Sequence, residues 1–173
     1  QRQMCIRDSV GGILELSASS INSQKNLEST TGSVISKITS SFNIKVSDTG
    51  TNIGSYIDSI QYYATKVSAV YCSGGDINIT ASQYFNNVAV LSKLNMNDNF
   101  WNYKISSATA LQAINLNSTI NTHFGNSSIS VNDTVSNVAR NISGLQNIAQ
   151  NNKLNSISMA IGSATITSAT YNS

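Results

Sequence analysis

An internal repeat is the feature that most limits what this chain can fold into. The segment KVSDTGTNIGSYIDSIQ, beginning at Lys45, matches SVNDTVSNVARNISGLQ, beginning at Ser130. After a two-residue insertion the match resumes, with KVSAVYCSGGDINITASQY against KLNSISMAIGSATITSATY. A shorter echo, LELSASS, begins at Leu14. Such periodicity is typical of stacked repeat proteins, because each repeat buries its apolar face against its neighbours.

Within each repeat, short β-branched segments alternate with segments of helical periodicity. We expect strands at residues 43–48, 67–72, 77–82, 102–106, 127–133 and 154–159. Apolar residues at spacings of three and four predict amphipathic helices along two stripes: Ile53, Ile57, Ile60 and Tyr63, and Val135, Val138, Ile142, Leu145 and Ile148. Shorter stripes predict further helix faces at Phe85, Val88, Leu91 and Leu94, and at Leu111 and Ile114.

An Asp-Thr pair stands at each switch from strand to helix, as Asp48-Thr49 and as Asp133-Thr134. A short oxygen side chain at this place can accept hydrogen bonds from the free N–H groups of the first helical turn. A carboxylate is also favoured at the positive end of the helix dipole. We therefore predict that Asp48, Thr49, Asp133 and Thr134 are structural helix caps.

A helix between consecutive strands favours parallel pairing, because the crossover returns the chain to the same end of the sheet. Three strand–helix layers in a period of about 85 residues give about 28 residues per layer, which is close to known solenoid repeats. The predicted fold class is therefore α/β, a solenoid of parallel strands and helices over residues 10–173. A doubly wound domain has no reason to repeat in sequence, and an all-β solenoid would make strands of the helical stripes.

The first nine residues, QRQMCIRDS, differ from everything after them. MCIRDS resembles one reading frame of the transposon end used in sequencing libraries, so we expect residues 1–9 to be a non-native scar. The alternative is a short polar tail. The chain ends at ITSATYNS, whose earlier counterpart continues into a helix. We therefore expect an internal fragment of a longer protein, truncated within a repeat.

The charge balance excludes some functions. Without residues 1–9 the chain has eight basic and seven acidic residues, so a basic face for nucleic acid is not expected. No apolar run reaches the roughly 18–20 residues that cross a bilayer. One cysteine remains, Cys72, which cannot form an internal disulfide and which we expect to be a small buried residue.

The segment ISVNDTVSNVARNISGLQNIAQNNKLNSISM resembles repeats of very large bacterial extracellular proteins, the β-strand-repeat or haemolysin-type proteins. The preceding NYKISSATALQAINLNSTINTHFGNSS resembles their linking strand–helix unit. This resemblance implies a secreted or cell-surface bacterial protein in which the repeats form a stalk, fibre or adhesive region. Its partners would be neighbouring repeats of the same chain, and a surface glycan or protein. The resemblance carries no catalytic residue to any position.

No residue pattern predicts an enzyme, a cofactor or a metal site. His123 lacks a surrounding nucleophile signature, and Gly74-Gly75-Asp76 occurs once, which favours a tight turn between adjacent strands over a calcium repeat. Trp101 and Tyr103 alternate on one strand face and are candidates for surface contact with glycan or protein, although core packing is the more common role. The alternative function is a ligand-binding solenoid, for glycan or for an ice surface.

Overall fold

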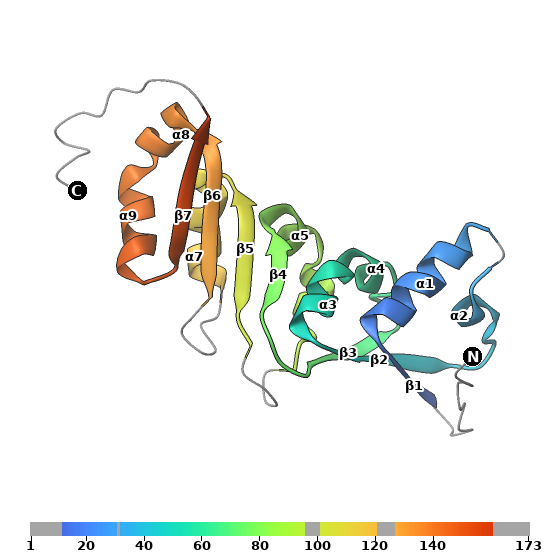
Figure 1. Cartoon of the computed structure of the whole chain (residues 1–173). Coiled ribbons are helices and arrows are strands. Elements are labelled where there is room, and N and C mark those ends of the chain that lie inside the picture. Colours follow the sequence, from blue (N-terminus) through green and yellow to red (C-terminus); the bar gives the residue numbers. More distant parts are fainter. Residues whose placement is uncertain (1–11, 31, 96–100, 121–126, 161–173) are drawn as a thin grey trace. The chain divides into compact units, whose positions relative to one another are not determined.

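The structure is a computed structural model that describes residues 12–30, 32–95, 101–120 and 127–160. It is an α/β fold with two parallel sheets (Figure 1). The chain divides into two compact units, one of Gln1–Gly74 with Asn87–Asn99 and one of Gly75–Asn86 with Phe100–Ser173. The scar predicted at residues 1–9, the interrupted repeat at the C-terminal end and His123 lie outside the described residues.

The first unit contains a three-stranded sheet in the order β1-β2-β3, in which both strand pairs are parallel. An isolated parallel bridge joins Val70 to Leu94. The elements in chain order are β1 (Gly12–Leu16), α1 (Ala18–Glu28), α2 (Val34–Lys37), β2 (Phe42–Asp48), α3 (Gly50–Ser55), α4 (Ile57–Tyr62), β3 (Val67–Cys72) and α6 (Val88–Leu91).

The second unit contains a four-stranded sheet in the order β4-β5-β6-β7, again with every pair parallel. Its elements are β4 (Ile77–Thr80), α5 (Ala81–Asn86), β5 (Tyr103–Ala108), α7 (Ala110–Thr119), β6 (Ser128–Thr134), α8 (Val135–Arg140), α9 (Ile142–Gln150) and β7 (Leu154–Ala160). In both units strand order follows chain order, so each connection advances by one strand.

The structure confirms the predicted strands and their parallel pairing. All six predicted segments are strands, with boundaries that differ by at most two residues, and β1 is a seventh. Alternate residues of the central strands are buried, as in β2, where Ile44 and Val46 are fully buried and Asn43 is exposed. Helices pack against the buried face, because the crossover between two parallel strands must cover one side of the sheet.

Each predicted long helix is two short helices in the structure. The helix is interrupted at Tyr56 between α3 and α4 and at Asn141 between α8 and α9, and Asn87 lies between α5 and α6 in the sequence. At all three residues φ lies between −110° and −115° and ψ between 15° and 21°, outside the helical range. In the two long stripes the apolar spacing continues across the break, at Tyr56 and at Asn141, so it does not reveal the break.

The helix faces predicted from the two shorter stripes were partly wrong. Phe85, Val88 and Leu111 are 40%, 54% and 59% exposed, while Leu91 and Leu94 are buried as predicted. In α7 the buried positions are instead Ala110, Ala113 and Leu116. Small residues can bring a helix close to the sheet, so a pattern search restricted to large apolar residues misses them.

The turn predicted between adjacent strands was partly wrong, because Gly74 and Gly75 form a bend between β3 and β4, and these two strands do not pair. They belong to different sheets. Gly74 has φ 133° and Gly75 has φ 80°, values that residues with a Cβ rarely adopt. The Gly74 carbonyl accepts the N–H of Gly50, the first residue of α3, at 2.9 Å. The bend therefore supplies an acceptor to a helix N-terminus.

Candidate functional site

The threonine of each Asp-Thr pair is the N-cap of the helix that follows. Thr49 has extended backbone angles, and its side chain accepts the N–H of Asn52 at 3.3 Å. Thr134 does the same for the N–H of Asn137 at 3.2 Å. A hydroxyl at this position satisfies one of the donors that a helix leaves free at its start.

Asp48 links the helix that follows β2 to the helix that follows β1. One carboxylate oxygen, Oδ1, accepts the Thr49 N–H at 2.8 Å and the Asn52 side-chain amide at 2.8 Å. The other oxygen, Oδ2, accepts the N–H of Ala18 at 3.0 Å, and Ala18 is the first residue of α1. The carboxylate therefore caps the helix of the neighbouring strand, which differs from the predicted role at its own helix alone.

Asp133 makes the same three contacts in the second unit. Oδ1 accepts the Thr134 N–H at 2.7 Å and the Asn137 amide at 2.8 Å, and Oδ2 accepts the N–H of Ala110, the first residue of α7, at 2.9 Å. The Ala110 N–H, and after it the Asn137 amide, holds the pKa of Asp133 below its ordinary value. The charged form is therefore the one that the folded state stabilises.

Other helices also begin at a Ser or Thr that follows or ends a strand or loop, without a preceding Asp. Ser17, Ser33 and Thr109 each accept the N–H three residues later, and Thr80 accepts the N–H of Gln83 at 3.1 Å. Thr109 forms a full capping box with Gln112. A Ser or Thr at the strand end, followed by Ala or Gly and then by Gln or Asn at the third position, is the signal that would have found several of them.

Trp101 and Tyr103, the candidates for surface contact, are buried. Their exposed fractions are 2% and 5%. The two rings meet edge to face at 5.2 Å between centroids, and Tyr103 also contacts Tyr84 at 5.6 Å. These rings fill the interior of the second unit, because β5 turns Tyr103 and Ile105 toward the helices. They present no aromatic surface to a ligand.

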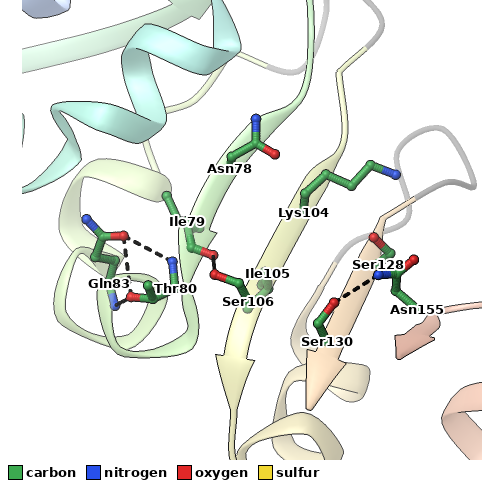
Figure 2. Close-up of a pocket in the computed structure, with 10 residues that line it drawn as sticks. All are labelled: Asn78, Ile79, Thr80, Gln83, Lys104, Ile105, Ser106, Ser128, Ser130 and Asn155. Carbon is green, nitrogen blue, oxygen red and sulfur yellow. Dashed lines mark hydrogen bonds between the residues drawn. The ribbon is translucent and has the colours of Figure 1, made fainter. Parts of the chain in front are cut away.

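The open face of the four-stranded sheet carries a shallow groove of about 350 Å³. Figure 2 shows polar side chains that project from neighbouring strands into it. Lys104 stands in register with Asn78 on one side and with Ser128 on the other. The lining residues are Asn78, Ile79, Thr80, Gln83, Lys104, Ile105, Ser106, Ser128, Ser130 and Asn155.

The lining of this groove offers hydrogen bonds rather than reactive groups. It contains hydroxyls, amides and one ammonium group, and no carboxylate or imidazole that would activate a serine. Some of these polar groups are already hydrogen-bonded to one another. The Asn155 amide donates to the Ser130 hydroxyl at 3.0 Å, and the Gln83 side chain accepts the Thr80 N–H at 3.0 Å. Lys104 lies 3.9 Å from Asp76. The groove suits a neutral, hydroxyl-rich ligand better than a charged one.

Within the described ranges, no three His, Cys, Asp or Glu residues gather in a way that would hold a metal ion. The Cys72 side chain is buried and is not part of a disulfide, and its Sγ donates to the Gly74 carbonyl at 3.7 Å. Among the same residues, no helix has the length and apolar character needed to cross a membrane. Comparison with protein-family models, with curated proteins and with solved structures finds no match to this chain.

Proposed function

We propose that this chain is a structural and adhesive repeat segment of a large secreted or cell-surface bacterial protein, in which strand–helix layers stack as an α/β solenoid. The proposal rests on the internal repeat and on the resemblance to extracellular repeat proteins. In such a stack each layer contacts only its neighbours, so stability accumulates along the array. The segment would extend and display other parts of its protein.

The observation that carries the proposal is the recurrence of the carboxylate link between layers. Asp48 and Asp133 occupy matching positions in the two copies of the repeat, and each accepts a helix N–H from the preceding layer and two donors from its own. A catalytic residue is needed at one position of a protein and has no reason to recur in each repeat. In a stack the same bond can recur at junctions between layers, and this one recurs at two of them, between β1 and β2 and between β5 and β6.

Pulling the chain from its two ends in an optical trap tests the stacked arrangement. A solenoid is expected to unravel in serial steps, each releasing about 28 residues, or about 95 Å of extended chain. Full release in one or two cooperative steps would contradict it.

The location has a separate test. Antibodies to this chain should label unpermeabilised cells of the producing bacterium, and labelling only after lysis would contradict a surface role.

Glycan binding is the second candidate function, and the polar groove of the four-stranded sheet supports it. Ice binding has less support, because an ice-binding face needs threonine in the same place on every layer. The row in register across β4, β5 and β6 is Asn78, Lys104 and Ser128. Titration of the folded chain with neutral oligosaccharides tests whether this groove binds them. The binding affinity of Lys104→Ala is measured beside that of the wild type.

A further inference from the structure

A second hollow in the first unit combines an exposed aromatic ring with a carboxylate, an amide and an ammonium group. It has a volume of about 440 Å³ and lies where the C-terminal ends of α1 and α4 meet. Its lining residues are Lys25, Asn26, Glu28, Ser29 and Tyr62. No sequence motif marks any of them, and the stacking of layers does not require an exposed ring here.

Tyr62 is 58% exposed, whereas its neighbour Tyr63 is 5% exposed. The two rings meet at 4.9 Å between centroids with an interplanar angle of 87°, so the buried ring supports the exposed one edge to face. A ring held in this way offers a flat apolar surface at low cost in conformational entropy. The C–H face of a pyranose ring is a surface of matching size and character.

Glu28 stands beside this ring as a fixed hydrogen-bond acceptor. Its Oε1 accepts the Ser33 hydroxyl at 2.5 Å and the Tyr63 hydroxyl at 3.0 Å. The bond from Ser33 is the main cause that lowers the pKa of Glu28, so the carboxylate is charged at neutral pH. A carboxylate of this kind accepts strong hydrogen bonds from sugar hydroxyls.

We propose that the hollow at Tyr62 binds a neutral sugar residue of a glycan, stacked on the Tyr62 ring with its hydroxyls bonded to Glu28 and to the polar side chains of Lys25 and Asn26. The opposite charges of Lys25 and Glu28 balance, which favours a neutral sugar over an anionic one. A few convergent polar groups beside one apolar surface are the usual composition of a small-ligand site. This site goes beyond the stalk function and is separate from the groove of the four-stranded sheet.

The test is a glycan array probed with the whole chain, carrying neutral oligosaccharides of glucose, galactose, mannose and N-acetylglucosamine beside sialylated and sulfated ones. We expect binding to at least one neutral class. Tyr62→Ala should weaken that binding roughly tenfold or more, and Tyr62→Phe should keep most of it, because stacking needs the ring and not its hydroxyl. Circular dichroism shows whether each variant is folded.

Tyr71→Ala is the matched control, since this partly exposed tyrosine lies on the open face of β3 under Lys45. It should bind as the wild type does. Absence of binding to every neutral glycan would overturn the proposal, as would unchanged binding by Tyr62→Ala. Loss of binding in Lys104→Ala alone would assign the glycan to the groove of the other unit. None of these results bears on the optical-trap test of stacking, so the two proposals can fail separately.

Discussion

The two units share the contacts that join neighbouring strand–helix pairs and differ in the surface that they present. Asp48 and Asp133 make matching bonds, and the register shift between β2 and β3 after Ile44 recurs between β6 and β7 after Ile129, at the matching place of the other copy. The open face of the first sheet carries a charged row, with Glu15 3.0 Å from Lys45. In the second sheet the row is mostly neutral. The contacts between neighbouring strand–helix pairs are therefore kept while the exposed face varies.

One pair of helix positions shows how the interiors differ. In the first unit Ser59 of α4 is buried and donates to Asn22 of α1 at 2.8 Å. The matching pair in the second unit is Gly144 of α9 and Ile114 of α7. A Cβ on Gly144 would lie 2.4 Å from the Ile114 side chain, so the larger residue occupies the space that glycine leaves. A polar pair and an apolar pair thus fill equivalent places.

The largest expected loss of stability comes from truncating a buried strand residue, and it tests whether the two sheets have equivalent cores. Ile44 and Ile129 are both 0% exposed and lie at matching places in β2 and β6. Each change to alanine should cost about 2–5 kcal/mol of unfolding free energy, because it removes buried methyl groups and leaves a cavity. Urea denaturation followed by circular dichroism measures this cost. Val88→Ala, at a 54% exposed position, is the control and should cost far less.

The next effect concerns the helix pair. Gly144→Ser should destabilise the second unit by about 1–3 kcal/mol, because its new side chain collides with Ile114. Adding Ile114→Asn should restore part of the loss, since this recreates the hydrogen-bonded pair of the first unit. A double-mutant cycle in urea measures the coupling. If the losses of unfolding free energy from Gly144→Ser and Ile114→Asn simply add, the polar pair of the first unit cannot replace the apolar pair of the second.

Removing the carboxylate link should cost less. Asp133→Ala leaves the Ala110 N–H without its acceptor and should lower stability by about 0.5–2 kcal/mol at neutral pH. Since the pKa of Asp133 is lowered in the folded state, its contribution is present above the ordinary value of 3.8 and is lost as pH falls through the lowered pKa.

Melting temperatures of wild type and Asp133→Ala should therefore differ at pH 7 and converge under strongly acidic conditions. Asn132→Ala, at the exposed neighbouring position, is the control and should melt as the wild type does at both pH values. A difference between wild type and Asp133→Ala that stays constant down to low pH would show that packing, and not the charged carboxylate, links the layers.

The smallest effect belongs to the exposed ion pair. Glu15→Gln should change the unfolding free energy by less than about 1 kcal/mol, and added salt should reduce the change, because the Glu15 side chain is 67% exposed. Asn78→Ala on the other sheet should show no dependence on salt. Thermal melts at low and high ionic strength check both. A large salt-dependent loss in Glu15→Gln would mean that the charged row supports the first sheet.

Strand positions could be predicted closely because β-branched residues alternate in short runs that end at turn residues. The parallel pairing of the strands could be predicted because helical stripes lie between those runs. The Asp-Thr pairs marked where helices begin, but they did not show that Asp48 reaches Ala18 in the preceding layer. Local rules describe the helix that follows a cap, whereas this contact depends on how closely two layers approach.

Candidate contact residues were harder to predict than the fold. The sequence places Trp101 and Tyr103 on one face of a strand but does not say which face the helices cover, and the structure buries both. For the adjacent aromatic residues Tyr62 and Tyr63, the helical stripe did distinguish the two. Their exposures differ widely because Tyr63 continues the stripe of Ile53, Ile57 and Ile60 and Tyr62 does not.

The sequence by itself determined the alternation of strands and helices, the parallel order and the places where helices start, since these follow from spacing and from cap chemistry within a few residues. The tertiary structure decided which neighbouring helix each aspartate caps, where the helices break and that Trp101 and Tyr103 are buried. Those outcomes depend on contacts between segments that belong to successive layers, whose distances are set by packing and are not encoded in any short run of residues.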